Sequence, residues 1–561
     1  MRVFIGTLVV LAACCAMVLP VMGGELANGT SPFSEENFRT HVATLASDAF
    51  EGRGPGTAGE TKTVEYISRT FEQAGLQPGG DRLPGGQRSW TQRVPLRRSK
   101  IDGASDVELA TDSGSIVWKQ GSEIAVRATL TGKRRVKIER APVVFVGYGV
   151  TAPERAWDDY KKTDVRGKIL VILMNDPDFE TGSGAFGGKT MTWYGRSIYK
   201  FEEAAHRGAL GVLLIHEDAA VGGYGWATTR NSNTGEVFDI DEPHPEKEHP
   251  LLEAWIQVAA AEDLLRRAGQ DFAALKVAAR GADFHPVQLK GVTLTTDHRV
   301  ETSVVLSHNV VAYLPGATRP DQYVAYTAHW DAHGVGQYPD ANGDRIYHGA
   351  GDNASGTAML LELGRYFAHQ PRPARSLLFI AVTAEEKGML GSKYYATAPL
   401  FPLEKTAAEI NMDGVLGAGR ARSVSTLGDS QNTLQDELKQ LASETGRYLE
   451  PDSLPEAGLF TRSDQFPFAK RGVPSLGFSP GNDLLAGGLS AGLAAKRDYL
   501  AKQYHQPADK YDPSIDFGNM SDDALLLAKL GSSVAEARDW PEWNTASEFK
   551  PVRDRTRNLR P

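Results

Sequence analysis

The chain has 561 residues, of which 41% are apolar and 23% are charged, and this composition excludes long disorder, collagen and coiled coil as the dominant structure. Lysine and arginine number 61 against 70 aspartates and glutamates, which gives a net charge of −9. This acidic balance argues against a nucleic-acid partner, because binding to phosphates requires a basic surface.

The first 23 residues predict export. A positive start at Arg2, an apolar stretch and small residues up to Gly23 are typical of a signal peptide. An alternative is a lipoprotein signal, since the string LAAC would place a lipid on Cys14, and an uncleaved membrane anchor is a third reading. The only cysteines of the chain, Cys14 and Cys15, lie in this segment, so the mature chain would contain no disulfide. No later apolar run reaches the roughly 20 residues needed to span a bilayer. We therefore expect an exported protein, periplasmic or extracellular, without a membrane span.

The middle of the chain predicts a β-rich insert. Residues 33–80 begin with the turn-rich string SDAFEGRGPGTAGE, followed by a helix in which Val64, Ile67 and Phe71 recur at helical spacing. The segment 137–290 differs, because VVFVGYGV and KILVILM read as strands and FEEAAHRGALGVLLIHE as a helix followed by a strand. The string ETGSGAFGGKT between them is a Gly-rich connector.

From residue 303 onward, strands and helices alternate, which predicts a doubly wound α/β sheet. The strands are NVVAYLPG, YVAYTAHWD, SLLFIAVTAEE, AEINMDG and VPSLGFSPG, and the helices include GTAMLLELGRYFA and DDALLLAKLGSSVAEA. The basic final string KPVRDRTRNLRP is expected to be a solvated tail.

Several strand ends carry residues of the kind that bind metals. YVAYTAH ends at His329, with Asp331 two residues later; SLLFIAVTAEE ends at Glu385 and Glu386; and AEINMDG ends near Asp413. Functional groups of open α/β sheets gather beyond the carboxyl ends of the strands, so these side chains should converge. Each feature alone is more often structural, and it is their joint order that favours a metal site.

Two further residues complete this pattern. Asp352 lies in the Gly-rich string GAGDNASG just before a helix, where its carboxylate could be shared between two metals, and His505 follows a long loop. Imidazoles together with carboxylates suit zinc. The adjacent glutamates can have different roles, with Glu386 as a metal ligand and Glu385 as the group that accepts and donates the proton of a water molecule.

The strings AHWDAHG, GAGDNASG, TAEEKGMLGS, NMDG, RSDQFPFAKRGVPSLGF and YHQPADKYD occur in this order. Together they resemble the di-zinc exopeptidase family, which includes leucyl-type aminopeptidases, glutamate carboxypeptidase and the non-catalytic transferrin receptor. SDAFEGRGPGTAGE is similar to the start of that family, and 137–290 is similar to its protease-associated insert. The resemblance covers nearly all of the mature chain.

The resemblance implies a domain organisation. The fold would be an α/β doubly wound mixed sheet with helices on both faces, plus an inserted β-rich protease-associated domain. The expected segments are a signal peptide at 1–23, the N-terminal part of the peptidase domain at 24–136, the insert at 137–290, the catalytic domain at 291–540 and a C-terminal tail at 541–561.

The resemblance also implies the roles of the site residues and two Zn²⁺ ions. The implied ligands are His329 and Asp413 for one zinc, Glu386 and His505 for the other, and Asp352 as the bridge. Glu385 would be the general base and acid, and the Asp331 carboxylate would orient His329. The complete ligand set argues against a transferrin-receptor-like binding protein.

The substrates implied by the resemblance are peptides. Phe460 stands where related aminopeptidases often have a tyrosine, and Tyr504 is a candidate to supply that hydroxyl. Asp464 or an insert residue is the candidate to hold a free ammonium group, whereas Arg462 is the candidate for an α-carboxylate. The string YHQPADKYD favours an aminopeptidase over the alternative, a glutamate carboxypeptidase-like enzyme. No oligomeric state is predicted.

A serine hydrolase is the competing enzyme class. GFSPG fits the nucleophile-elbow pattern with Ser479 as the nucleophile. The oxyanion hole of such an elbow uses the backbone N–H of the next residue, which here is Pro480 and has none. The sequence therefore disfavours this class.

Overall fold

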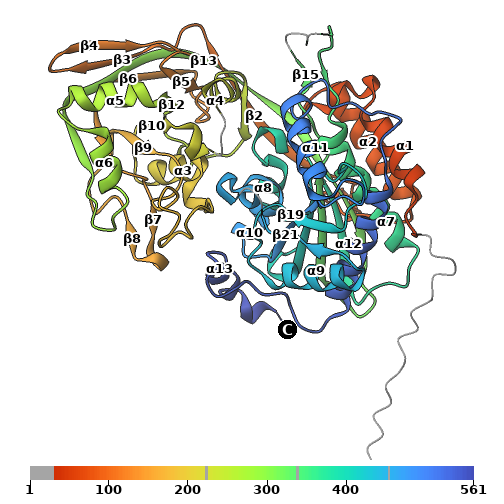
Figure 1. Cartoon of the computed structure of the whole chain (residues 1–561). Helices are drawn as coiled ribbons and strands as arrows, with labels where there is room; N and C mark the ends of the chain where they lie inside the picture. The colour runs from red at the N-terminus through yellow and green to blue at the C-terminus, as the bar shows by residue number, and fades with distance from the viewer. Residues whose placement is uncertain (1–30, 222–224, 337–339, 341, 453–454, 561) are drawn as a thin grey trace, which may run out of the picture.

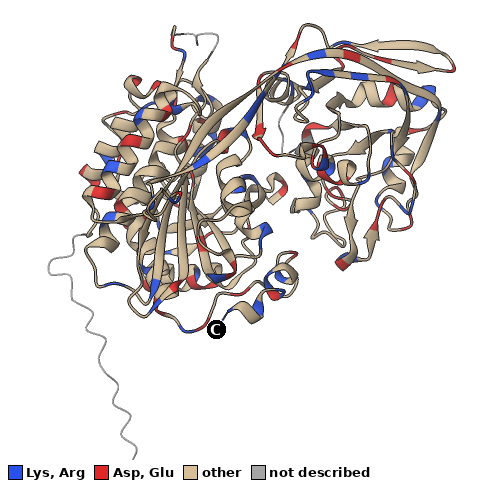
Figure 2. Cartoon of the chain, turned by 180° about the vertical axis from the view of Figure 1, so that it is seen from behind, with Lys and Arg blue, Asp and Glu red and all other residues tan. Residues whose placement is uncertain are grey.

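Two lobes joined by a ribbon of two long strands make up the molecule (Figure 1). The computed structural model describes residues 31–221, 225–336, 340, 342–452 and 455–560, so the predicted signal peptide and Cys14 lie outside the described residues. Strand β13 (Val287–Leu314) runs from one lobe into the other, and β2 (Thr91–Asp102) pairs antiparallel beside it. Figure 2 shows this ribbon from behind and acidic and basic residues interspersed over both lobes.

The first lobe, called here the α/β lobe, is built on a mixed sheet in the order β1-β13-β17-β14-β18-β21-β19-β20. Its four central strands, β17, β14, β18 and β21, are parallel. The strands other than β13 are β1 (Gln77–Pro78), β14 (Arg319–His329), β17 (Arg375–Val382), β18 (Thr406–Met412), β19 (Ser423–Thr426), β20 (Tyr448–Leu449) and β21 (Ser475–Pro480), with a separate hairpin of β15 (Gly334–Val335) and β16 (Ile346–Tyr347). The helices are α1 (Glu35–Leu45), α2 (Ala58–Gln73), α7 (Ser355–Ala368), α8 (Leu390–Thr397), α9 (Thr433–Glu444), α10 (Gln465–Lys470), α11 (Gly488–Lys502), α12 (Gly518–Glu536) and α13 (Lys550–Asp554).

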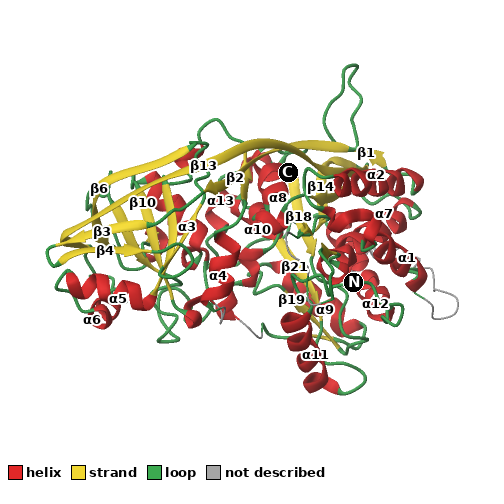
Figure 3. Ribbon diagram, turned by 90° about the horizontal axis from the view of Figure 1, so that it is seen from above, coloured by secondary structure: helices red, strands yellow, loops and turns green. Residues whose placement is uncertain are grey.

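Helices cover both faces of this sheet, as predicted (Figure 3). Side chains alternate across a strand, so Val324 and Tyr326 of β14 face one apolar core while Ala325 faces another. The first core includes Phe38 of α1 and Leu527 of α12. Strands buried on both faces explain the nearly continuous apolar runs of the sequence.

The second lobe is β-rich. Its strands are β3 (Val107–Thr111), β4 (Gly114–Trp118), β5 (Ile124–Arg127), β6 (Arg135–Phe145), β7 (Thr151–Ala152), β8 (Trp157–Asp158), β9 (Ile169–Leu173), β10 (Gly211–His216), β11 (Val237–Ile240) and β12 (Leu252–Gln257), and its helices are α3 (Ser197–His206), α4 (Trp226–Asn233), α5 (Val258–Arg267) and α6 (Phe272–Ala278). One apolar core runs through the lobe from Val107 to Val300. It therefore extends beyond the predicted insert 137–290 at both ends, because β3 pairs with β13 and β5 pairs with β12.

The segment before the basic final string packs against the α/β lobe, whereas most described residues of that string, 550–560, are exposed or half-buried. Trp543, Phe549 and Arg553 are buried, and the Arg553 guanidinium donates to the carbonyl oxygen of Thr406 at 3.1 Å. Among the described residues, no helix combines the length and apolar character that crossing a bilayer requires.

Candidate metal centre

Three strands of the α/β lobe deliver acidic and imidazole side chains to one edge of the sheet. Strand β14 ends at His329, Glu385 and Glu386 begin a short turn after β17, and Asp413 follows β18 directly. Because β14 runs parallel to both neighbours, these three ends lie at the same edge.

Two loops complete the cluster. Asp352 lies in the turn that leads into α7, with a cis peptide bond to Asn353. The Asp509 carboxylate accepts the backbone N–H groups of Gly351 at 2.9 Å and of Asp352 at 3.0 Å. His505 follows α11 in a left-handed backbone conformation with φ 56°. Asp509 thus ties the loop after α11 to the turn that carries Asp352.

The side-chain atoms form two groups that share one carboxylate. In the first group, His329 Nε2 lies 3.2 Å from Asp352 Oδ1 and 3.2 Å from Asp413 Oδ1. In the second, Glu386 Oε2 lies 3.2 Å from His505 Nε2 and 3.3 Å from His333 Nε2. The other oxygen of Asp352, Oδ2, lies 3.2 Å from His505 Nε2. Asp352 therefore contacts both groups through different oxygens.

These spacings fit zinc. A tetrahedral site with ligands about 2.0 Å from the ion has ligand atoms about 3.3 Å apart. The distances within each group, 3.2–3.3 Å, match that edge length. Imidazole nitrogens with carboxylate oxygens are also a donor set that zinc accepts. The predicted ligands His329, Asp352, Glu386, Asp413 and His505 are all among these donors.

The tautomer of His329 is fixed by its surroundings. Its Nδ1 lies 3.1 Å from the backbone carbonyl oxygen of Asp331 and 3.7 Å from the Asp331 carboxylate. A carbonyl only accepts, so Nδ1 carries the proton and Nε2 is left for a metal. The nearer partner is thus the backbone of Asp331, whereas the sequence prediction named its carboxylate.

The carboxylate of Asp331 has another contact. It accepts the backbone N–H of Glu385 at 3.0 Å and that of Glu386 at 3.4 Å. Burial raises the pKa of the Glu385 carboxyl; His329 opposes this shift, while Asp413 adds to it. Asp331 therefore positions the turn that carries both glutamates.

The residues predicted to contact substrate lie in different settings. Tyr504 stacks on the ring of His505 with centroids 3.8 Å apart, so its side chain is at the cluster. Asp464 is fully buried and accepts the Ser392 hydroxyl at 2.5 Å, and its role toward a substrate ammonium group stays a prediction. Partly buried Arg462 precedes Ser463, whose hydroxyl donates to Asp413 Oδ2 at 2.6 Å.

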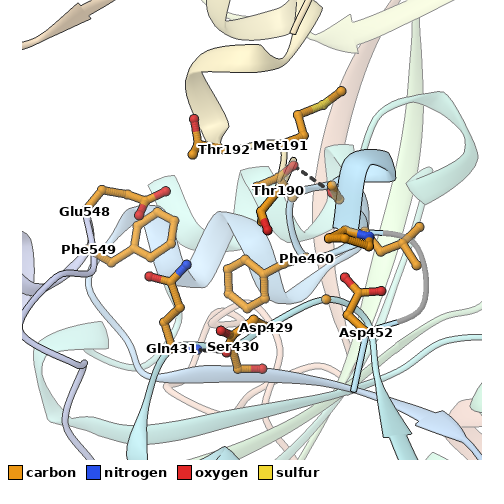
Figure 4. A pocket seen from close by; sticks show the side chains of 15 residues that line it. Thr190, Met191, Thr192, Asp429, Ser430, Gln431, Asp452, Phe460, Glu548 and Phe549 are labelled. Atoms are coloured by element: carbon orange, nitrogen blue, oxygen red, sulfur yellow. Dashed lines mark hydrogen bonds between the residues drawn. The ribbon is translucent and has the colours of Figure 1, made fainter. Parts of the chain in front are cut away.

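Phe460 lines a pocket between the lobes (Figure 4). The β-rich lobe contributes Thr190, Met191 and Thr192, and the C-terminal segment contributes Glu548 and Phe549. The pocket adjoins the segment that leads to Ser463, and it combines apolar with acidic lining.

Sequence reasoning missed His333 and Arg53. His333 lies in the string AHWDAHG four residues after His329, a spacing that could have indicated it. Arg53, which is fully buried, donates to the carbonyl oxygens of Trp330 at 2.8 Å, His348 at 2.6 Å and Gly349 at 2.8 Å. Its guanidinium joins the loops that follow β14 and precede Asp352.

Ser479 is part of a regular strand rather than a sharp elbow. It lies within β21 and is paired with Ser425 of β19. This placement agrees with the prediction that the chain is not a serine hydrolase.

Residues 309–529 match the family model described as peptidase family M28. This part of the chain is similar to that family. The match contains every donor residue of both groups, and it agrees with the resemblance to di-zinc exopeptidases.

Relatives are similar over short segments. A probable zinc metalloprotease from Pyricularia oryzae is 33% identical over 149 residues, which make up 24% of this chain and 28% of the relative. The aminopeptidase NAALADL1 from Mus musculus is 36% identical over 128 residues, 22% of this chain and 15% of the relative. The matched segments thus span less than a third of either relative. Among solved structures, the aminopeptidase from Aneurinibacillus sp. strain AM-1 is 18% identical, with a TM-score of 0.49 over 90% of this chain and 95% of that one.

Proposed function

We propose that the chain is an exported exopeptidase with two zinc ions, an aminopeptidase that removes amino-terminal residues from peptides. The observation that carries this proposal is the pair of donor groups that share Asp352, with Glu385 on the same turn as Glu386. The proposed ligands are His329 and Asp413 for one ion, Glu386 and His505 for the other, and Asp352 for both.

Bound zinc would polarise the scissile carbonyl and lower the pKa of a water molecule. Glu385 would take the proton of that water and later deliver it to the leaving amine. Asp331 would hold the Glu385 backbone in place through its hydrogen bond, and the Tyr504 hydroxyl is proposed to contact the substrate beside His505.

The aminopeptidase proposal concerns which peptide end is recognised. The string YHQPADKYD resembles the aminopeptidase version of the family motif, and it supports recognition of a free amino terminus. Arg462 is the residue that a glutamate carboxypeptidase-like alternative would use for an α-carboxylate.

A panel of peptides blocked at one end distinguishes an aminopeptidase from a carboxypeptidase. Acetylating the amino terminus of a good substrate should abolish cleavage, because the group that the site recognises is lost. Amidating the carboxyl terminus should change the rate little. Cleavage of acetylated peptides and refusal of amidated ones would overturn the aminopeptidase proposal and make Arg462 the first residue to mutate.

Export is proposed from the signal-like first 23 residues, with a lipid anchor on Cys14 as the alternative. Mass spectrometry of the amino-terminal peptide of the mature protein distinguishes a cleaved signal peptide from a lipid anchor. A soluble product that begins near residue 24 supports cleavage, whereas a lipid-modified Cys14 supports the anchor.

A further inference from the structure

The second donor group contains a third side chain, His333. Its Nε2 lies 3.3 Å from Glu386 Oε2, and its ring meets the ring of His505 edge-on with centroids 4.5 Å apart. One donor atom from each of these three residues falls within 4.8 Å of the others. The Nε2 atoms of His333 and His505 thus lie at nearly the same distance from Glu386 Oε2, 3.3 Å and 3.2 Å.

Backbone packing fixes the position of His333. It directly precedes β15, which pairs with β16 through Gly334 and Tyr347, and its ring also packs edge-on against Tyr347 with centroids 5.5 Å apart. A Cβ atom at Gly52 would lie 2.4 Å from the carbonyl oxygen of Gly334, so the segment around Gly52 packs directly on this hairpin. The hairpin therefore fixes the backbone next to His333, and the ring itself packs against Tyr347 and His505.

The two groups are consequently unequal. The first offers His329 and Asp413 together with the shared Asp352, which makes three protein ligands. The second offers Glu386, His505, His333 and Asp352, which makes four. Zinc sites with four protein ligands are usually closed, whereas sites with three keep a position open for water or substrate.

We propose that His333 is an additional nitrogen ligand of the metal ion held by Glu386 and His505. This inference rests on the proposed metal centre. It makes that ion the more tightly bound of the two and leaves the open position to the ion held by His329 and Asp413. A competing role for His333 is to donate a hydrogen bond to Glu386 without binding metal.

Cadmium-113 NMR of protein with nitrogen-15-labelled histidine tests the proposal without a variant. The proposal expects ring nitrogens of His329, His333 and His505 to show one-bond coupling to bound cadmium. Coupling from His329 and His505 alone would overturn it.

Zinc affinity of His333→Ala and His333→Gln gives a second test, measured by chelator competition. Loss of a residue that only orients a ligand weakens metal binding by about 10–100-fold, so loss of a ligand should exceed about 100-fold at one of the two sites. Glutamine retains an N–H donor, so recovery in His333→Gln would favour the hydrogen-bonding role and overturn the proposal. His348→Gln is the matched control, because His348 is buried nearby but lies outside both donor groups.

The outcomes separate this inference from the proposed function. Two bound zinc ions with unchanged affinity in His333→Ala would overturn only the role of His333. A wild-type chain that binds no zinc would overturn the metal centre itself, and this inference with it.

Discussion

The carboxylate of Asp331 accepts the backbone N–H of Glu385 at 3.0 Å, so a residue at the end of one strand positions the proposed base at the end of the next. In the wild type, the two oxygens of Asp331 accept the backbone N–H groups of Glu385 and Glu386. Asp331→Asn should disturb this turn, because its amide oxygen can accept one of them but its NH₂ group cannot accept the other. We expect a fall in kcat of about 10–100-fold with most of the zinc retained.

Asp352→Asn is the comparison for this prediction. It alters a carboxylate that contacts both donor groups, so it should lose more zinc than Asp331→Asn. Metal analysis of both purified variants checks this, and equal zinc content would contradict the bridging role of Asp352.

Glu385→Gln tests the proton-transfer role. Glutamine keeps the size and the backbone N–H of the residue but cannot take a proton, so turnover should fall by at least about 10²-fold. Zinc content should be unchanged, since Glu385 is in neither donor group. Near-normal turnover in the zinc-loaded variant would remove Glu385 from this role.

Arg53→Met should destabilise the α/β lobe. The guanidinium donates to the carbonyl oxygens of Leu45, Trp330, His348 and Gly349, which would be left without this donor. The free energy of unfolding should fall by several kcal/mol, since each buried carbonyl oxygen left without a donor costs about 1–3 kcal/mol. Urea unfolding measures it.

The matched control is Arg39→Met, whose guanidinium also donates to carbonyl oxygens, those of Pro513 and Ile515, but from a more exposed position. Its effect should be much smaller. If Arg53→Met and Arg39→Met lowered the free energy of unfolding by similar amounts, burial of Arg53 would not account for its contribution to stability.

The sheet and the convergence of its strand ends could be predicted, because apolar strands ending in His329 and Asp413 are visible in the sequence. The start of the β-rich lobe could not, since the pairing of β3 with β13 joins segments far apart in the chain. Arg53 and Asp509 were missed because their partners are backbone groups, which leave no pattern in the sequence.

Glu409 makes the stability of the fold depend on pH. It is buried on β18, where its carboxyl accepts the Thr327 hydroxyl at 2.6 Å, and burial raises its pKa to about 8. An unfolded glutamate has a pKa of about 4.3, so between these values the folded state keeps a proton that the unfolded state releases. The free energy of unfolding should therefore fall as pH rises through this range.

Glu409→Gln removes this titration and keeps an acceptor for Thr327. The stability of the variant relative to the wild type should grow from about pH 5 to about pH 8, by up to a few kcal/mol, since one pKa unit corresponds to about 1.4 kcal/mol. Urea unfolding across this range measures the difference. A difference that stays constant with pH would show that Glu409 does not hold the proton.

Zinc titration of the chelator-stripped chain tests the central claim most directly, with bound zinc, melting temperature and hydrolysis of an aminoacyl anilide followed together. Because the donors come from separate segments of the α/β lobe, zinc should raise the melting temperature as it restores activity. The account predicts saturation at two zinc ions per chain. Saturation at one ion or none, or full activity in the stripped chain, would contradict it.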